Sequence, residues 1–270
     1  MSFPRFQEKF GQEPFFNPGD FLGYMKRLGS IPDSDPPRGV ILAYQSSLAR
    51  HVVETCSTRP AGQYFGDKIR YIDDDWAGGG RVALASDFGV GAPAAAVMLE
   101  ELIAWGVREF VSIGFAGSLR ADLPPGSFVL CTRAFRDEGT SRHYLPGEEP
   151  ALPDPGLTVR LGAALSRSEL EYSSGPAWTT DAIYRETAVE VLGYRDLGAL
   201  VVEMEASALF AVASFRKVAL AACFSVSDTP AELAWRPEFH AQSTREGLQK
   251  LLRAAVDALN PASSRLESFP

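Results

Sequence analysis

Two carboxylates follow an apolar stretch at the point where a strand would end. Glu203 and Glu205 come directly after Val201 and Val202, just before a run that is typical of a helix. Burying an ionised carboxylate is costly unless hydrogen bonds satisfy it. Two carboxylates at a strand end can accept such bonds from a vicinal diol, as on a sugar. Extended backbone would point both glutamates to one side and Met204 to the other. The alternative is that Glu205 only favours the N-terminus of the next helix.

A third carboxylate, Asp228, ends the most apolar strand candidate in the chain, residues 217–227. Burial at that point would favour the neutral carboxyl, because desolvation penalises the charged form. A carboxyl group that keeps its proton at working pH can act as a general acid. The sequence Ser-Asp-Thr-Pro also fits a turn or a helix cap, and both interpretations stay open.

Two glycine-rich turns follow other strand candidates. In "SDFGVGAPAAA" (86–96), Gly89 and Gly91 let the backbone approach a ligand closely, and the following helix N-terminus attracts anions. In "IGFAGSL" (113–119), Gly114 and Gly117 leave space beside a buried strand. Tight structural packing is the alternative explanation for each turn. Ligands of α/β sheets bind where strands end and helices begin, so the turns and the carboxylates are candidates for a site.

Apolar runs and helical periodicities alternate along the chain, and these elements must position the groups above. Continuous apolar runs are typical of strands that are covered on both faces. The predicted strands are 40–44, 81–86, 109–114, 127–135, 199–203 and 217–227. The predicted helices are 92–106, 156–171, 185–198, 205–215 and 241–259. In the first helix, Pro93 suits the first turn and Gly106 is placed to stop it.

The pattern predicts an α/β fold, a single domain with a central mixed β-sheet flanked by helices. We expect an N-terminal arm at residues 1–38, a catalytic domain at 39–262 and a C-terminal tail at 263–270. The arm is rich in Pro, Gly and Phe, and its aromatic side chains are expected to pack on the domain or on a neighbouring subunit.

The composition excludes several classes of protein. With 46% hydrophobic and 22% charged residues, the chain has the composition of an ordinary soluble globular protein. A net charge of −8 argues against nucleic acid as a partner. The sequence has no membrane-length apolar run and no secretory h-region, so we expect a cytoplasmic protein without a membrane partner. The 3 cysteines and 3 histidines show no metal-like spacing, so we expect no metal site.

Taken in order, the motifs resemble those of the nucleoside phosphorylase superfamily, the purine nucleoside and uridine phosphorylases with their nucleosidase relatives. "GVGAPAAAVMLEELIAWGVREFVSIGFAGSL" (89–119) is similar to the family's glycine turn, helix, strand and second glycine loop. "VVEMEASALFAVA" is close to its ribose-binding signature, and "SVSD" matches the strand that carries the catalytic aspartate of the purine enzymes. "RDEGTSRHYLP" (136–146) is similar to a loop that lies over the site, and "WTTDAIYRE" (178–186) corresponds to the segment that lines the base pocket.

The resemblance implies a nucleoside phosphorylase, which cleaves the N-glycosidic bond of a nucleoside with phosphate to give free base and pentose 1-phosphate. Inorganic phosphate is then a co-substrate, no cofactor is needed, and the context is purine salvage. The implied site residues are Glu203, Met204 and Glu205 for the ribose, Asp228 as the catalytic acid, Ala116, Gly117 and Ile183 for the base, and Gly89, Val90, Gly91, Phe115 and Arg70 for the phosphate or sugar loop.

The sequence departs from the family at the phosphate site. Tyr44 stands where the phosphorylases have a glycine, and Leu48 and Ser112 stand where they have phosphate-binding arginines. Phe115 replaces a hydroxyl residue. Charge-assisted bonds to arginine supply much of the affinity for anions, so two alternatives to phosphorolysis follow. One is a nucleosidase that uses water, in which Phe115 caps a site too small for phosphate. The other is a non-catalytic nucleoside-binding homologue.

The resemblance also bears on the base and on assembly. The residues with which uridine phosphorylases read uracil fall at Thr187 and Val189, which favours a purine. Because the family completes its sites with residues of a neighbouring subunit, the resemblance implies a homodimer or a homohexamer.

Overall fold

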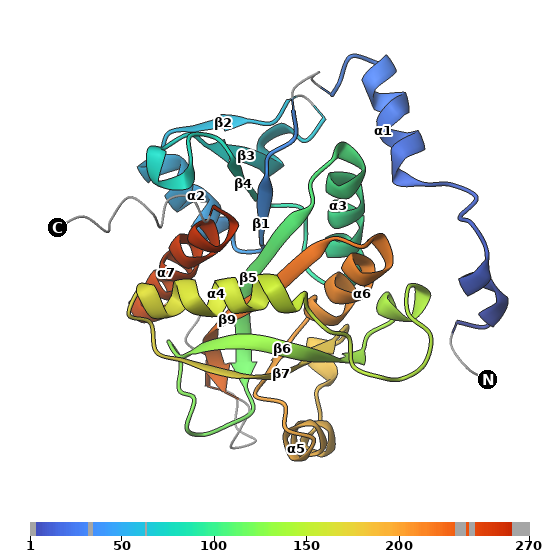
Figure 1. Cartoon of the computed structure of the whole chain (residues 1–270). Coiled ribbons are helices and arrows are strands. Elements are labelled where there is room, and N and C mark those ends of the chain that lie inside the picture. The colour runs from blue at the N-terminus through green and yellow to red at the C-terminus, as the bar shows by residue number, and fades with distance from the viewer. Residues whose placement is uncertain (1–3, 32–34, 63, 230–235, 238–240, 261–270) are drawn as a thin grey trace.

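In the part of the chain that the structure describes, a mixed sheet of ten strands forms the centre (Figure 1). The computed structural model describes residues 4–31, 35–62, 64–229, 236–237 and 241–260, so the predicted tail at 263–270 lies outside the described residues. The strand order is β10-β9-β6-β7-β8-β5-β1-β4-β3-β2. The strands are β1 (Gly39–Ala43), β2 (Thr58–Pro60), β3 (Ile69–Ile72), β4 (Val82–Ala85), β5 (Glu109–Ser118), β6 (Phe128–Asp137), β7 (Tyr172–Thr180), β8 (Val201–Glu203), β9 (Ala219–Thr229) and β10 (Arg236–Pro237).

Five of these strands close into a ring. β9 pairs with β6 on one side and with β5 on the other, while β6, β7, β8 and β5 follow one another in the sheet. β5 and β9 run parallel, and their register shifts between Ala116 and Gly117. At this point Gly117 pairs with both Asp228 of β9 and Val202 of β8. The ring therefore brings the ends of three strands together.

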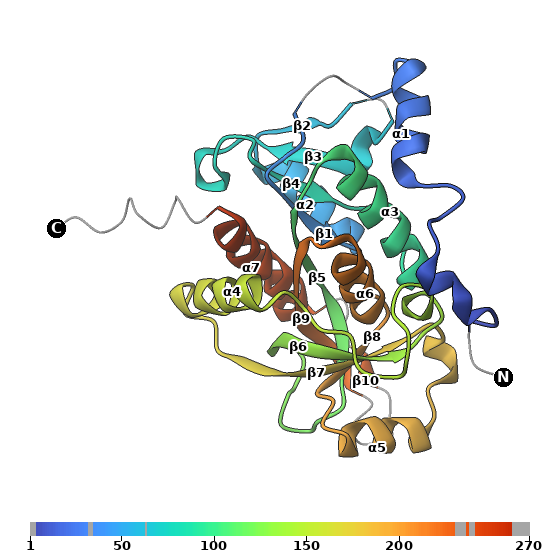
Figure 2. The ribbon, with the colours of Figure 1, turned by 45° about the vertical axis from the view of Figure 1, so that its right-hand side comes forward.

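Helices cover both faces of the sheet (Figures 1 and 2). They are α1 (Pro18–Arg27), α2 (Ser46–Thr55), α3 (Ala92–Trp105), α4 (Pro155–Arg167), α5 (Ala188–Asp196), α6 (Ala206–Arg216) and α7 (Gln242–Leu259). Short 3-10 helices lie at Gln7–Gly11, Gly66–Lys68, Asp75–Ala77, Ser141–His143 and Ile183–Arg185. We refer to two hydrophobic clusters, one on each face. The first contains buried residues of α1, α3 and α6, and the second contains buried residues of α2, α4 and α7.

The two clusters explain the apolar runs in the sequence. Every residue of β1 and of β4 is buried, because both faces of these central strands are covered. The predicted α/β domain with a mixed central sheet is confirmed. The first predicted helix is confirmed as well: α3 carries Pro93 in its first turn and ends at Gly106, whose φ of 125° suits glycine.

Several elements were not predicted from the sequence. The N-terminal arm contains α1, which begins with a capping box between Asn17 and Asp20. Phe21 of α1 packs on Tyr64 with the ring centroids 5.6 Å apart, so part of the arm lies on the domain. β7 was missed because Gly175 and Pro176 interrupt its β-branched and aromatic residues.

Gly175 has a packing reason that no local pattern contains. A Cβ built at this position would lie 2.4 Å from Cδ1 of Leu200, the residue just before β8. The absence of a side chain lets the two segments approach, and β7 pairs in parallel with β8 from Ala177↔Val201 to Thr179↔Glu203. This pairing places Thr179 beside Glu203. No helix in the described ranges has the length and apolar character needed to cross a membrane.

Candidate active site

Glu203 and Glu205 lie at the junction of β8 and α6, and both are buried, with exposed fractions of 5% and 6%. The prediction that they share one side of an extended strand is wrong. Extended pairing ends at Glu203, and Glu205 has a ψ of −32° because the backbone already turns into α6. The two carboxylates consequently have different partners.

Glu203 caps the N-terminus of α6. Its Oε2 accepts hydrogen bonds from the backbone N–H groups of Glu205 and Ala206, each at 2.7 Å. Its Oε1 accepts a hydrogen bond from the hydroxyl of Thr179, and the Thr179 Oγ1 accepts one from the N–H of Ser207 at 3.0 Å. The first N–H groups of a helix have no partner within the helix, so this pair of side chains satisfies three of them. Glu203 is thus held by the protein itself.

Replacing Glu203 with alanine is expected to lower the free energy of unfolding by about 2–4 kcal/mol, because it leaves buried N–H groups and the Thr179 hydroxyl without an acceptor. Urea unfolding followed by circular dichroism measures this. Glu205→Ala is the matched control, since the Glu205 side chain makes no capping bond. Equal unfolding midpoints for the two variants would contradict the capping role.

Glu205 reaches away from the helix that it precedes. Its Oε1 accepts a hydrogen bond from the backbone N–H of Gly91, 2.6 Å away and 114 residues earlier in the chain. Glu205 is the N-cap residue of α6, but its side chain makes no capping bond and turns to the glycine turn instead. Burial, followed by the charge of Glu203, raises the pKa of the Glu205 carboxyl above its ordinary value of 4.5. Burial raises the pKa of Glu203 in the same direction.

The glycine turn before α3 has the geometry that holds Glu205. Gly89 and Gly91 have φ values of 110° and 95°, which side-chain-bearing residues rarely adopt. A Cβ at Gly91 would lie 3.9 Å from Cε of Met204, so Met204 packs over the turn. Val90 between them is 61% exposed. The structure thus brings together Gly91, Met204 and Glu205 of the predicted set.

The raised carboxyl pKa values have a consequence for stability. Carboxyls that hold protons more tightly in the folded than in the unfolded state stabilise the fold at low pH, and this stabilisation is lost as the pH rises through their folded-state pKa values. The free energy of unfolding of the ligand-free protein should therefore fall as the pH rises through neutrality. Melting temperatures measured from about pH 6 to pH 9 test this. Glu205→Ala should flatten the slope, and an unchanged slope in that variant would contradict the assignment.

Tyr44, which is close to Glu205, contacts both Phe88 and Ser112. The Oη of Tyr44 and the Oγ of Ser112 are 2.9 Å apart, and the rings of Tyr44 and Phe88 meet edge to face at 5.6 Å. The Glu205 carboxylate is close enough for its charge to raise the pKa of Tyr44, after burial as the main cause. Phe88 was not predicted as a site residue, because the signal of this turn in the sequence is its glycines.

Two predicted phosphate-loop residues have other surroundings. Phe115 packs against the second cluster, as Val111 and Ile113 of the same strand do, whereas Tyr44 packs against the first. Alternation along β5 therefore points the Phe115 ring to the opposite face of the sheet. Arg70 of β3 donates hydrogen bonds to Thr58 and Asp67, which hold it on the β2–β3 hairpin.

Asp228 lies at the end of β9 beside the bulge of β5. Gly117 pairs with it in the sheet, and Ala116 just before the bulge is 4% exposed. Ser227 donates a hydrogen bond to the Asp228 Oδ1 at 2.8 Å. Asp228 is therefore a strand residue here rather than a helix cap. Ile183 lies in a 3-10 helix and is 44% exposed.

Glu186 also belongs to this region, although the sequence did not predict it as a site residue. Burial and then the charges of Asp228 and Glu190 raise the pKa of Glu186 to about 7. The side chain thus lies near Asp228, 42 residues later in the chain. Within the predicted base-pocket segment 178–186, the sequence analysis named Ile183 but not Glu186. Thr187 and Glu190 instead form the capping box of α5.

The loop after β6 is fixed on α6 by buried polar groups. Arg136 donates hydrogen bonds to the Ser141 hydroxyl and to backbone carbonyls of the loop, among them Leu145 at 2.6 Å. Glu138 is 3% exposed and accepts hydrogen bonds from the N–H of Ser141 and from the hydroxyl of Ser207 in α6. Because Ser207 lies in the first turn of α6, these bonds tie the loop to the helix that Glu203 caps.

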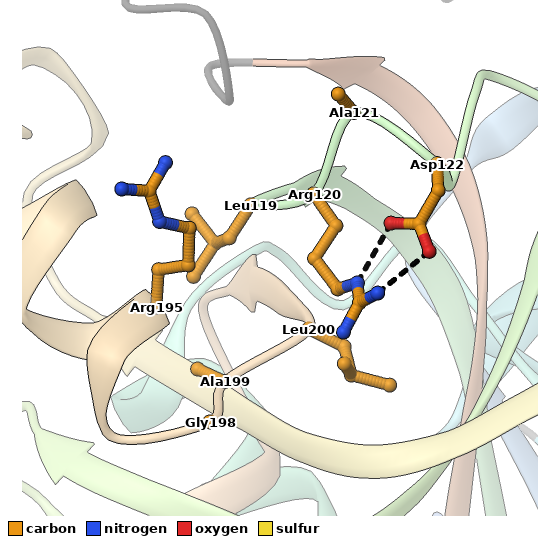
Figure 3. Close-up of a pocket in the computed structure, with 8 residues that line it drawn as sticks. All are labelled: Leu119, Arg120, Ala121, Asp122, Arg195, Gly198, Ala199 and Leu200. Atoms are coloured by element: carbon orange, nitrogen blue, oxygen red, sulfur yellow. Dashed lines mark hydrogen bonds and ion pairs between the residues drawn. The ribbon is translucent and has the colours of Figure 1, made fainter.

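An open pocket of about 380 Å³ lies at the other end of β8 (Figure 3). In it the guanidinium of Arg120 donates hydrogen bonds to both carboxylate oxygens of Asp122, at 2.7 and 2.6 Å. Arg195 lies on its rim, 4.0 Å from the carboxylate of Asp196. These pairs are exposed ion pairs of the ordinary kind, so we place the candidate site at the carboxylates of β8 and β9 instead.

Comparison with known proteins identifies the family. A family profile described as "Phosphorylase superfamily" matches residues 37–259. The chain is 42% identical over 126 residues to a guanosine phosphorylase of Halorubrum lacusprofundi, covering 46% of this chain and 52% of that protein. It is 32% identical over 141 residues to a uridine phosphorylase of Treponema pallidum, covering 48% of this chain and 55% of that protein. The chain thus spans about half the length of these two relatives.

Solved structures show the same fold. A purine nucleoside phosphorylase from Toxoplasma gondii, in complex with immucillin-H, superposes with a TM-score of 0.72 at 19% identity, covering 86% of this chain and 93% of that one. An AMP nucleosidase from Bacteroides thetaiotaomicron has a TM-score of 0.71 at 21% identity, covering 92% and 100%. With the profile match over most of its length, this chain belongs to the phosphorylase superfamily, a family that includes nucleoside phosphorylases.

Proposed function

We propose that this protein cleaves purine ribonucleosides with inorganic phosphate, releasing the free base and ribose 1-phosphate. The observation that carries the proposal is the buried Glu205 carboxylate, which turns to Gly91 while Glu203 caps α6. This division leaves Glu205 as the acceptor for the 2′- and 3′-hydroxyls of a ribose. Met204, which packs over the same turn, would contact the sugar.

The base is proposed to lie between Ala116, Gly117, Asp228 and Glu186. Two carboxyls near one another, of which Glu186 has a pKa of about 7, can present a proton donor and an acceptor together. A 6-oxopurine such as guanine offers the complement, a ring nitrogen that takes a proton and N–H groups that donate to a carboxylate. The guanosine phosphorylase among the relatives supports the same class of base.

The chemistry follows from these positions. The bond between C1′ and the purine nitrogen breaks, and its electron pair goes to the base. Asp228 gives or shares a proton with a ring nitrogen, so that the base leaves without a full negative charge. An oxygen of phosphate forms the new bond to C1′, and negative charge near the ring stabilises the oxocarbenium-like transition state.

A nucleosidase is the second candidate, and one observation favours it. Leu48 and Ser112 stand where the resemblance puts the arginines of the phosphorylases, and the uncharged Tyr44, packed on Phe88, lies near Glu205 instead. Water would then attack C1′ in place of phosphate.

The experiment that tests the proposal measures base release from guanosine, inosine, adenosine and uridine, each with and without phosphate. We expect guanosine and inosine to be cleaved only when phosphate is present, and uridine to be cleaved poorly. Glu186→Gln should lower guanosine cleavage more than adenosine cleavage. Release that is indifferent to phosphate would identify a nucleosidase, and preferential cleavage of uridine would contradict the assignment of the base.

A further inference from the structure

Tyr44 and Ser112 form a hydroxyl pair whose place is fixed by the sheet. β1 and β5 are neighbours in parallel, with Leu42 opposite Ser112 and Ala43 opposite Ile113, so Tyr44, which follows β1, comes level with Gly114, two residues beyond Ser112. Ser112 is 1% exposed, and its Oγ lies 2.9 Å from the Tyr44 Oη. The pair links the end of one strand to the middle of the next.

The tyrosine ring is packed on two sides. A Cβ built at Gly114 would lie 3.1 Å from Cδ2 of Tyr44, so the ring packs closely on this glycine. Phe88 holds it from another direction, in an edge-to-face contact. A ring packed in this way presents its hydroxyl at a fixed point, and pre-organised donors contribute most to binding and catalysis.

The number of protons in the pair matters. Tyr44 and Ser112 together carry two hydroxyl protons, and the bond between them uses one, whichever residue donates it. One proton remains for a third group. Burial and the Glu205 charge keep the phenol of Tyr44 protonated, because both raise its pKa. The pair is therefore a neutral donor of a single hydrogen bond.

The third group can be located from the sugar. The hydroxyls that Glu205 would hold include the one on C2′, and C1′ is one bond away from C2′. An oxygen that attacks C1′ must arrive next to the groups surrounding Glu205, and Tyr44 is one of these.

We propose that the Tyr44–Ser112 pair positions the attacking phosphate by donating its remaining proton to a phosphate oxygen, in place of a charged side chain. The inference rests on the proposed phosphorolysis. It makes Tyr44 and Ser112 residues of the nucleophile site, and because one neutral hydrogen bond replaces charge-assisted ones, it predicts weak binding of phosphate.

The test is the steady-state kinetics of Tyr44→Phe and Ser112→Ala. Phosphate is varied at saturating guanosine in one series, and guanosine is varied at saturating phosphate in the other. Tyr44→Phe keeps the ring that packs on Gly114 and Phe88, and it removes only the hydroxyl. We expect the KM for phosphate to rise about 10-fold to 100-fold, the size expected for a lost hydrogen bond to a charged group, while the KM for guanosine changes less than about 2-fold. The double variant should be little worse than Tyr44→Phe, because the two hydroxyls act as one unit.

Tyr71→Phe is the matched control. Tyr71 lies on β3, and its hydroxyl donates a hydrogen bond to the backbone carbonyl of Asp35 at 3.0 Å. The substitution removes this phenol hydroxyl and should leave the KM values for phosphate and for guanosine unchanged. Phosphate-dependent cleavage by the wild type, combined with an unchanged phosphate KM in Tyr44→Phe, would overturn this inference alone. Cleavage by the wild type without phosphate would overturn the proposed function, and this inference with it.

Discussion

Replacing Glu205 with alanine is expected to lower kcat/KM for guanosine by about 10²-fold to 10⁴-fold, through a higher KM and a lower kcat together. The variant loses the acceptor of two hydroxyl hydrogen bonds, each to a charged group. Its melting temperature should change little, because the capping of α6 depends on Glu203 and Thr179. Removing a carboxylate that is 6% exposed also removes a desolvation cost, which offsets the loss of the Gly91 bond.

A substrate lacking the diol provides the control for this result. For the wild-type protein, kcat/KM should fall from guanosine to 2′,3′-dideoxyguanosine by a factor similar to the one by which Glu205→Ala lowers kcat/KM for guanosine. The variant itself should distinguish the two substrates poorly. Glu203→Ala should instead lower the free energy of unfolding while it keeps most of the preference for guanosine over the dideoxy compound. If Glu205→Ala still prefers guanosine over the dideoxy compound by the wild-type ratio, Glu205 does not bind the ribose.

Asp228→Asn is expected to cut guanosine cleavage by about 10²-fold to 10⁴-fold, the range that general acids usually contribute. Asparagine keeps the volume at the end of β9 but has no carboxyl proton to give to the leaving base. The fold should persist, because Asp228 is paired with Gly117 through the backbone of the sheet. Initial rates of guanine release measure the effect.

The leaving group distinguishes an acid from a residue that only shapes the pocket. In 7-methylguanosine the base already carries a positive charge on its imidazole ring and leaves without protonation. Asp228→Asn should cleave this nucleoside within about 10-fold of the wild-type rate. An equal loss for guanosine and 7-methylguanosine would mean that another group assists the departure of the base.

The sequence predicted the elements whose signals are local. β1, β4, β5 and β9 were predicted because strands covered on both faces leave continuous apolar runs. α3 was predicted because Pro93 and Gly106 mark its ends. α2 was not predicted, because its polar first turn resembles a loop. β7 was not predicted, because it contains Gly175, which is needed only to make room for the side chain of Leu200. That contact is a property of the folded chain.

The site follows the same division. The identities of Glu203, Glu205 and Asp228 could be selected from strand ends, but their partners could not. Glu205 bonds to Gly91, and Glu203 bonds to Thr179, 24 residues earlier. These long-range contacts decide whether a carboxylate caps a helix or is available to bind a ligand. The roles of the two glutamates therefore could not be distinguished from the sequence.

The most direct measurement for the central claim is ³¹P NMR of the protein with guanosine and inorganic phosphate. The account predicts that the inorganic phosphate signal falls while a sugar phosphate signal grows. The amount of sugar phosphate formed should equal the amount of guanine released. Guanine released with free ribose and an unchanged phosphate signal would contradict phosphorolysis. No guanine release at all would contradict the assignment of Glu205 and Asp228 to a catalytic site.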